Sequence, residues 1–242
     1  MPRLSGVTNP AATGFSVVVP FYNEGELVAE VLQELRAQLP DAEIVAVDDG
    51  SSDDTWARIK DAAGVRGLRF TRNQGQSAAI YHGLRATTQP IVGLMDGDGQ
   101  NDPANFIPLL AEFAKGHADV VCGYRRRRND TWRRRGASRI ANAIRRFFLD
   151  DGVSDTGCSQ KVFGREAVEL LMPFRGMHRY LPAIFKHAGL RIAEVPVNHR
   201  PRRRGQSKYN NWTRAIHGIY DLVGVVWLLN RKIIPPQIET KP

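Results

Sequence analysis

The 242-residue chain has the composition of a folded protein, because hydrophobic residues make up 42% of it and charged residues 24%, which excludes wholesale disorder. Its length favours one domain, or one domain with an appendage. Its two cysteines, Cys122 and Cys158, form neither a metal-binding spacing nor a disulfide framework, so we expect a reducing, intracellular setting.

The first half of the chain alternates short apolar strands with helices. FSVVVP (residues 15–20) precedes apolar residues at a spacing near 3.6, which predicts an amphipathic helix. Further strands are predicted at EIVAV, GLRFT, PIVGLM and DVVCGY, and further helices from about residue 54, over residues 77–86 and from Pro103. This order predicts an α/β fold with a mostly parallel sheet and helices on both faces. No G-x-G-x-x-G motif opens the first helix, which disfavours NAD.

Acidic residues follow two of these predicted strands. MDGDGQNDP places Asp96 and Asp98 directly after PIVGLM, and Asp48 and Asp49 follow EIVAV. Such runs also occur as solvated or helix-capping turns. However, the carboxyl ends of parallel strands meet at one edge of a sheet, where α/β proteins bind ligands. On an extended segment Asp96, Asp98 and Gln100 would point the same way and would suit Mg²⁺ or Mn²⁺.

Basic residues concentrate in two windows. Residues 125–146 contain ten arginines and one acid, and residues 196–208 contain four arginines, one lysine and no acid, within a chain of net charge +9. A solvated basic face, nucleic acid and an anionic membrane are the alternatives. Residues 125–128 contain no aromatic side chain on which bases could stack, which disfavours nucleic acid as a partner.

Two later segments have the pattern of amphipathic helices. Residues 132–149 carry aromatic and aliphatic residues on one side and arginines elsewhere, as in a helix that lies at a membrane interface or packs on a core. Residues 212–229 form a second candidate, in which Trp212, Tyr220 and Trp227 are packing residues or membrane anchors. The apolar run 219–229 contains Asp221 and is shorter than a membrane span, and no signal sequence is expected.

These motifs together resemble the family 2 glycosyltransferases of GT-A (Rossmann-like) fold, over about residues 15–230. The branch concerned acts on polyprenyl phosphates, and includes the dolichol-phosphate mannose synthases and the bacterial undecaprenyl-phosphate 4-deoxy-4-formamido-L-arabinose transferases. From VVVPFYNE, VDDGSSDDT and NQGQSAAIYHG the resemblance implies a nucleotide-sugar pocket, whose base or ribose contact is Asp48 or Asp49 and whose other residues are Pro20, Tyr22, Glu24, Gly75 and Gln76. The D-x-D-x-Q motif implies that Asp96, Asp98 and Gln100 hold Mg²⁺ or Mn²⁺.

The later motifs resemble the acceptor segments of the same branch. NDTWRRRGASRIAN implies that Arg134 and Ser138 contact a lipid phosphate, and RRRGQSKY implies that Arg202 and Lys208 hold phosphates. Arg125 is expected to grip the acceptor phosphate as well, since guanidinium groups suit phosphate oxygens. Asp155, in DTGCSQKVFGR, is expected in the site as a base, a sugar-hydroxyl ligand or an orienter of basic residues, and we favour the last two.

The resemblance therefore implies an inverting enzyme that moves a sugar from a nucleotide-sugar, UDP favoured over GDP, to a polyprenyl phosphate. Asp98, Asp155, Arg134 and Lys208 are its expected catalytic residues. The alternatives are a glycan or soluble acceptor and, from another class, a nucleic-acid-binding protein. We expect a flexible segment 1–14, a glycosyltransferase domain 15–212 and a membrane-associating segment 213–242.

A cytoplasmic location on the inner face of the membrane is also expected. Many relatives in this branch end in two transmembrane helices, whereas this sequence stops at Pro242. We therefore expect attachment through the basic amphipathic surface or through a small membrane protein partner.

Overall fold

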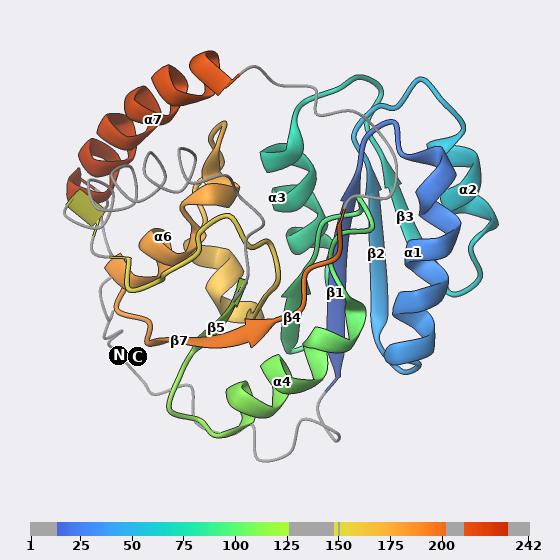
Figure 1. The fold of residues 1–242 in the computed structure, drawn as a ribbon, viewed down its shortest axis with the longest axis horizontal. Coiled ribbons are helices and arrows are strands. Elements are labelled where there is room, and N and C mark those ends of the chain that lie inside the picture. The colour runs from blue at the N-terminus through green and yellow to red at the C-terminus, as the bar shows by residue number, and fades with distance from the viewer. Residues whose placement is uncertain (1–13, 126–147, 150, 202–210, 232–242) are drawn as a thin grey trace, which may run out of the picture.

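The computed structural model describes residues 14–125, 148–149, 151–201 and 211–231 (Figure 1). Its centre is a seven-stranded sheet in the order β3-β2-β1-β4-β6-β5-β7. The strands are β1 (Phe15–Phe21), β2 (Glu43–Asp48), β3 (Val65–Arg69), β4 (Ile91–Leu94), β5 (Val120–Arg125), β6 (Lys161–Gly164) and β7 (Ile192–Val197). Within this sheet β6 runs against its neighbours β4 and β5, and the other strands share one direction.

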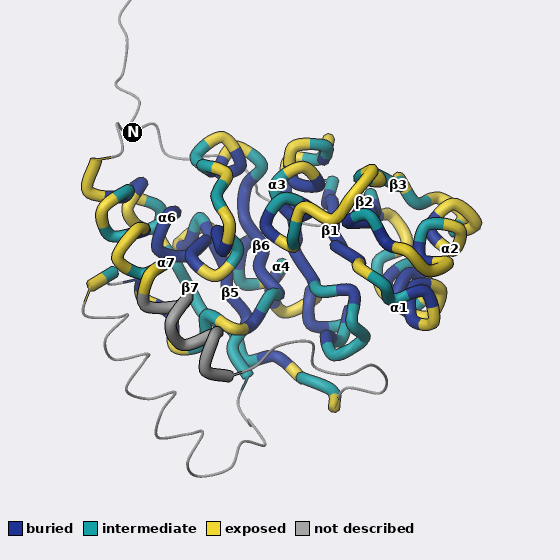
Figure 2. The backbone as a smooth tube through the Cα atoms, turned by 90° about the horizontal axis from the view of Figure 1, so that it is seen from above, coloured by how far each residue is buried: buried dark blue, intermediate teal, exposed yellow. Residues whose placement is uncertain are grey.

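Helices cover both faces of the sheet, and each face has its own hydrophobic core. Helices α1 (Gly25–Gln38), α2 (Thr55–Asp61) and α4 (Phe106–Ala114), the last preceded by the 3₁₀ turn η1 (Pro103–Asn105), cover one face. The other face is covered by α3 (Gln76–Ala86), η2 (Arg165–Leu170), η3 (Met177–Arg179), α6 (Leu181–His187) and α7 (Asn211–Arg231). Figure 2 shows β1, β2, β4 and β6 buried along almost their whole length, whereas the edge strands β3 and β7 are only partly buried.

This architecture confirms the predicted α/β fold with a mostly parallel sheet and helices on both faces. Strand β6 was not predicted from the sequence, in which its four residues KVFG lie inside the motif DTGCSQKVFGR. A strand this short gives no periodic pattern, and it is buried on both sides because it lies between β4 and β5. β6 inserts one antiparallel strand into an otherwise parallel sheet, and the segment that enters it therefore ends beside the strand end of β4.

Helix α7 packs on the core with one side and exposes the other. Val225 and Leu229 are buried in the core shared with α3 and α6, whereas Tyr220, Val223 and Trp227 are 78%, 65% and 60% exposed. Among the described helices, α7 included, we find none with the combination of length and apolar character that crossing a bilayer requires. The helix expected over residues 132–149 lies outside the described residues, apart from residues 148 and 149. The domain limits expected at residues 14 and 212 stay predictions.

Candidate active site

The site lies where parallel strands end at one edge of the sheet. Strands β2, β1 and β4 are neighbours and run the same way, and β5 shares their direction. Their carboxyl ends lead into residues 20–24, 48–55 and 95–101 and to Arg125. The expectation that both acidic clusters lie on the same edge is therefore confirmed.

The segment after β1 is held by the segment after β2. Asn23, at φ 52°, donates its backbone N–H to the Ser51 hydroxyl at 2.9 Å and accepts the Ser52 N–H at 2.9 Å. The backbone N–H of Glu24 donates to the Thr55 hydroxyl at 2.9 Å. Ser51, Ser52 and Thr55, just before or at the start of α2, thus fix the Y-N-E segment. Pro20 is buried, and Tyr22 is 40% exposed.

Asp48 and Asp49 are both buried but differ in their contacts. Both carboxylate oxygens of Asp49 are occupied, because they accept hydrogen bonds from the Asn73 side chain and from the backbone N–H groups of Gln74 and Gly75. In Asp48, Oδ1 accepts the Ser51 N–H at 2.9 Å, whereas Oδ2 lies 3.2 Å from Arg69 Nε and, within the described part of the chain, accepts no hydrogen bond. Asp49 therefore shapes the loop, whereas Asp48 Oδ2 is held by the ion pair with Arg69.

The loop held by Asp49 opens helix α3 beside the second acidic cluster. Gly75 adopts φ 92°, a left-handed conformation that favours glycine, and Gln76 is the first helical residue. The Gln76 side chain donates from Nε2 to Asp96 Oδ1 at 2.8 Å. The two acidic clusters, far apart in sequence, are thereby joined through one side chain.

The D-x-D-x-Q segment is bent, so the expectation of an extended segment with side chains at i, i+2 and i+4 pointing one way was wrong. Residues 97–99 form a bend, with Gly99 at φ 72°. A Cβ on Gly97 would lie 2.5 Å from the Phe21 ring and 2.8 Å from the Pro20 carbonyl oxygen, so the chain turns against β1 where only glycine fits. Asp98 accepts the Gln100 N–H at 3.2 Å within this bend.

Asp96 and Asp98 have the chemistry of a site for a hard cation. Burial, and next the charge of Asp98, raise the pKa of the Asp96 carboxyl to about 6, so negative charge on Asp96 is opposed by repulsion from Asp98. A divalent cation would relieve that repulsion. No cluster of three or more His, Cys, Asp or Glu side chains suited to a metal occurs in the described ranges. Two carboxylates, with Gln100 beside them, fit Mg²⁺ or Mn²⁺ that takes its other ligands from phosphate and water.

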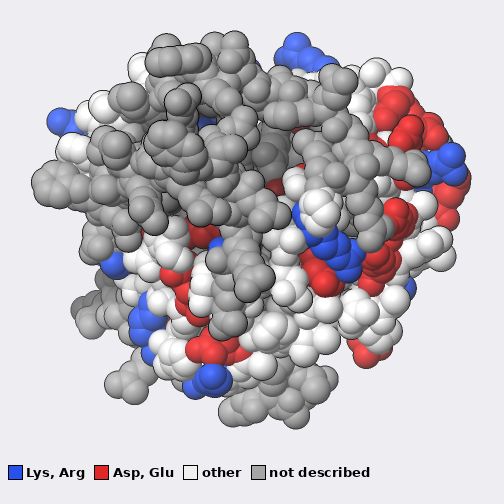
Figure 3. Space-filling model, viewed as in Figure 1, with Lys and Arg blue, Asp and Glu red and all other residues white. Residues whose placement is uncertain are grey.

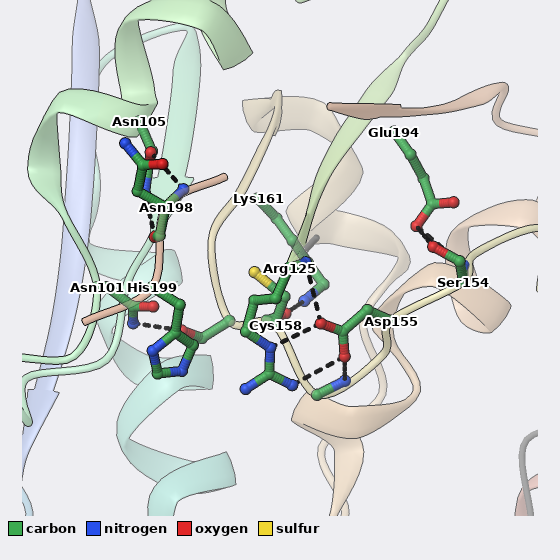
Figure 4. A network of polar contacts seen from close by, with 12 residues as sticks. Asn101, Asn105, Arg125, Ser154, Asp155, Cys158, Lys161, Glu194, Asn198 and His199 are labelled. Atoms are coloured by element: carbon green, nitrogen blue, oxygen red, sulfur yellow. Dashed lines mark hydrogen bonds and ion pairs between the residues drawn. The ribbon is translucent and has the colours of Figure 1, made fainter. Parts of the chain in front are cut away.

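Arg125 and Asp155 form a second polar centre at this edge (Figure 4). Arg125 Nε and Nη2 donate to the two oxygens of Asp155 at 2.7 and 2.8 Å, and their side chains are only 16% and 9% exposed. The Arg125 backbone N–H also donates to Asp155, at 3.2 Å. This geometry agrees with Asp155 as an orienter of a basic residue.

Two residues near Asp96, Lys161 and Ser159, were not predicted as site residues from the sequence. Lys161, at the start of β6, is 2% exposed, donates from Nζ to the Cys158 carbonyl, and has a charge that lowers the pKa of Asp96. Ser159 accepts a hydrogen bond from the Asp96 backbone. A lysine that opens the apolar stretch KVF was the available signal. Arg134, Ser138, Arg202 and Lys208 lie outside the described residues, and their roles stay predictions.

Comparison with known proteins identifies the family. Residues 16–171 match the family model described as "Glycosyl transferase family 2". The chain is 34% identical over 217 residues to the undecaprenyl-phosphate 4-deoxy-4-formamido-L-arabinose transferase of Enterobacter sp. (strain 638), and 35% identical over 217 residues to that of Sodalis glossinidius (strain morsitans). Each match covers 86% of this chain and 66% of the relative, so the chain spans just under two thirds of the length of these curated relatives.

Solved structures share the fold. Glucosyl-3-phosphoglycerate synthase from Mycobacterium tuberculosis in complex with UDP matches with a TM-score of 0.72 and 24% identity, over 91% of this chain and 83% of that chain. The same enzyme in complex with Mn²⁺, UDP-glucose and phosphoglyceric acid matches with a TM-score of 0.70 and 25% identity, over 90% and 83%. The motifs, the sheet edge and these matches agree, and the chain belongs to glycosyl transferase family 2.

Proposed function

We propose that this chain transfers a sugar from a nucleotide-sugar to a polyprenyl phosphate, with inversion at the anomeric carbon and with Mg²⁺ or Mn²⁺. The observation that carries the proposal is the meeting of the Asp96–Asp98 pair, Gln76 and the Arg125–Asp155 pair at one sheet edge. The relatives at 34% and 35% identity, named as undecaprenyl-phosphate sugar transferases, support the choice of acceptor.

The donor is proposed to be a UDP-sugar that binds over the ends of β1 and β2. Asp48 is the better candidate for recognising the base, because the contact of its Oδ2 is an ion pair with the half-exposed Arg69, whereas both oxygens of Asp49 hold a loop. Pro20, Tyr22 and Glu24 would line this part of the pocket. Gly75 and Gln76 would lie near the diphosphate, next to Asp96. UDP bound to proteins of the same fold supports this nucleotide.

The chemistry requires positioning more than proton transfer. A phosphomonoester has a second pKa near 6, so the acceptor is already largely anionic at pH 7 and needs no strong base. Bound at Asp96, Asp98 and Gln100, the divalent cation would act as a Lewis acid toward the departing diphosphate. Lys208 and Arg202 are proposed to neutralise further charge on that diphosphate.

The acceptor phosphate is proposed to bind next to Arg125. Asp155 fixes the Arg125 guanidinium with two hydrogen bonds, so the group is oriented before the phosphate arrives. Arg134 and Ser138 would complete the phosphate contact. Holding the nucleophilic oxygen in line with the anomeric carbon allows one direct displacement, which inverts the configuration.

A cytoplasmic site on the inner face of the membrane fits this acceptor, and α7 offers a surface for it. Tyr220, Val223 and Trp227 lie on the outward side of α7, and the Arg231 guanidinium lies 5.5 Å from the Trp227 ring centre. Exposed aromatic residues beside a cation suit the interface of an anionic membrane. On the described part of the face in Figure 3, basic and acidic side chains are interspersed. In the sequence, the basic excess lies in the windows 125–146 and 196–208, which hold fourteen arginines, one lysine and one acid, and their charge would add to this attraction. A small membrane protein partner is the other means of attachment.

The function is tested by following sugar label into lipid. The full chain is incubated with Mn²⁺, undecaprenyl phosphate in detergent and one labelled UDP-sugar at a time, and the products are extracted with butanol. We expect label in the organic phase with at least one UDP-sugar and none without undecaprenyl phosphate. Release of UDP with all label left in water would contradict the lipid acceptor.

A second candidate is transfer to a small soluble phosphate. Its support is that the M. tuberculosis enzyme of the same fold is described in complex with phosphoglyceric acid. The experiment above distinguishes the two when phosphoglyceric acid replaces undecaprenyl phosphate, because a soluble product stays in the aqueous phase. We favour the lipid acceptor, since the sequence identity to the undecaprenyl-phosphate transferases is higher.

A further inference from the structure

One hydroxyl group holds both ends of the D-x-D-x-Q segment. The Asp96 backbone N–H donates to Ser159 Oγ at 3.2 Å, and Asn101 Nδ2 donates to the same oxygen at 2.8 Å. The segment that runs from the first donor to the residue before the second, residues 96–100, carries both carboxylates and Gln100 and includes the bend at residues 97–99. Ser159 thus closes the segment into a loop through a single atom.

The direction of β6 explains why Ser159 lies there. β6 pairs antiparallel with β4, with Leu94 opposite Lys161. Two residues farther along this register, beyond the paired strands, Ser159 comes opposite Asp96. A parallel strand at this place would carry its chain away from the end of β4. The one strand of opposite direction in the described sheet therefore delivers the side chain that the loop requires.

A second set of contacts holds the other side of the loop. The Arg200 N–H donates to the Gln100 carbonyl at 2.8 Å, and Asn101 forms a β-bridge with His199. The Asn105 side chain donates from Nδ2 to the Asn198 carbonyl at 2.9 Å and accepts the Asn198 N–H at 3.0 Å (Figure 4). These contacts fix residues 100 and 101 against residues 199 and 200. The hydrogen bonds to Ser159 then set the position of Asp96 relative to Asn101.

We propose that Ser159 is a positioning residue, which sets the geometry of the Asp96–Asp98 pair toward a divalent cation without touching it. This rests on the proposed function of that pair. A serine oxygen accepts two hydrogen bonds and still donates one, so no apolar side chain of its size can replace it. Partners of this kind, one step removed from a metal ligand, commonly change metal affinity 10- to 100-fold, roughly, when removed.

The test compares Ser159→Ala with a matched control in the same segment, Ser154→Ala. The Ser154 hydroxyl donates a hydrogen bond to Glu194 Oε1 at 3.0 Å, and this contact does not involve residues 96–101. Mn²⁺ binding is titrated by electron paramagnetic resonance on the full chain, with Mn²⁺ alone and with Mn²⁺ plus UDP. We expect about tenfold weaker Mn²⁺ binding in Ser159→Ala, unchanged binding in Ser154→Ala, and recovery in Ser159→Thr, which keeps the hydroxyl.

Asn101→Ala provides a second variant, should Ser159→Ala fail to fold. It removes one of the two donors to Ser159 Oγ and should weaken Mn²⁺ binding in the same direction by a smaller factor. Equal Mn²⁺ affinity in Ser159→Ala and the unchanged chain would overturn the proposal, as would an equal loss in Ser154→Ala. An unchanged chain that binds no Mn²⁺ would overturn the metal pair and Ser159 together. Mn²⁺ binding without sugar transfer to lipid would remove the proposed function and leave the role of Ser159 standing.

Discussion

The Arg125 guanidinium lies in a two-pronged contact with the Asp155 carboxylate, at 2.7 and 2.8 Å, across thirty residues of sequence. The contact joins the end of β5 to the segment that leads into β6. Because both side chains are largely buried and two hydrogen bonds join them, the guanidinium is oriented before any ligand binds. Arg125 is thereby held at the same sheet edge as Asp96.

Replacing Asp155 should therefore affect the acceptor more than the donor. Asp155→Asn keeps the size of the side chain but weakens its hold on Arg125. We expect the free energy of unfolding to fall by about 2 kcal/mol and the KM for undecaprenyl phosphate to rise about tenfold, or about 1.4 kcal/mol, while the affinity for UDP stays unchanged. Denaturant titration, calorimetry with UDP and transfer kinetics measure these quantities.

Asp119→Asn is the control for this change, since Asp119 makes a similar two-pronged contact with Arg191 at the amino ends of β5 and β7, the opposite ends of these strands from the site. Its acceptor KM should match that of the unchanged chain. A rise in acceptor KM of the same size in both variants would show that the effect is general loosening.

Asp98→Asn should remove transfer activity while the protein remains folded. The amide keeps the shape of the side chain but supplies no negative charge to a divalent cation. We expect kcat/KM to fall at least a hundredfold, or about 2.7 kcal/mol, with a circular dichroism spectrum like that of the unchanged chain. Asp61→Asn, at an exposed position at the end of α2, serves as control. Full activity of Asp98→Asn in Mn²⁺ would contradict a role in metal binding.

The pKa of Asp96 predicts how the metal-free protein responds to pH. Because this pKa is about 6 in the folded chain and near 4 in the unfolded chain, the folded state binds more protons in that window. Stability from this group is therefore present below pH 4 and is lost as the pH rises through about 6. In EDTA, we expect the Tm difference between Asp96→Asn and the unchanged chain to grow in favour of the variant from pH 4 to pH 7.

Mn²⁺ gives the complementary result for Asp96. A cation at this site favours the ionised carboxylates, so it should raise the Tm of the unchanged chain at pH 7 and have little effect on Asp96→Asn. A Tm difference that does not change with pH would contradict the raised pKa of Asp96.

Arg200 should influence the position of the D-x-D-x-Q segment, residues 96–100, although it lies in a basic stretch of sequence. The Arg200 guanidinium contacts Glu34 at 2.6 Å and Asp102 at 3.1 Å. The backbone N–H of Arg200 donates to the Gln100 carbonyl. Arg200→Gln should lower kcat/KM about tenfold, or about 1.4 kcal/mol, at a stability cost within about 1 kcal/mol. Arg191→Gln breaks a comparable ion pair at the other end of β7 and should leave kcat/KM unchanged. Equal kinetic losses in the two variants would contradict a role of Arg200 at the loop.

The sequence predicted the elements whose pattern is local and periodic. The apolar spacing in α1 and the short apolar strands determined the fold class, and strand direction alone placed Asp48, Asp49 and Asp96 at one edge. Contacts that depend on tertiary structure were not predictable. The neighbouring sequence does not distinguish Asp48 from Asp49. They differ because Asn73 and Gly75, more than twenty residues away, donate hydrogen bonds to Asp49.

The same limit applies to charge and to β6. Arg200 counts as part of a basic run in sequence, but in the structure Glu34 and Asp102 neutralise it. Ser159 has a position opposite Asp96 only because β6 runs antiparallel, and a four-residue strand shows no sign of its direction in sequence. The bend likewise follows from the close approach of Gly97 to β1 and from the positive φ of Gly99.

The central claim is that Asp96 and Asp98 bring a divalent cation to the diphosphate of a nucleotide-sugar. The most direct measurement is anomalous scattering from crystals of the full chain soaked with Mn²⁺ and UDP. We predict one Mn²⁺ peak within coordinating distance of an Asp98 oxygen and of the UDP diphosphate, close to Asp96 and Gln100. A well-occupied UDP whose diphosphate lies away from these carboxylates, with Mn²⁺ elsewhere or absent, would contradict the account.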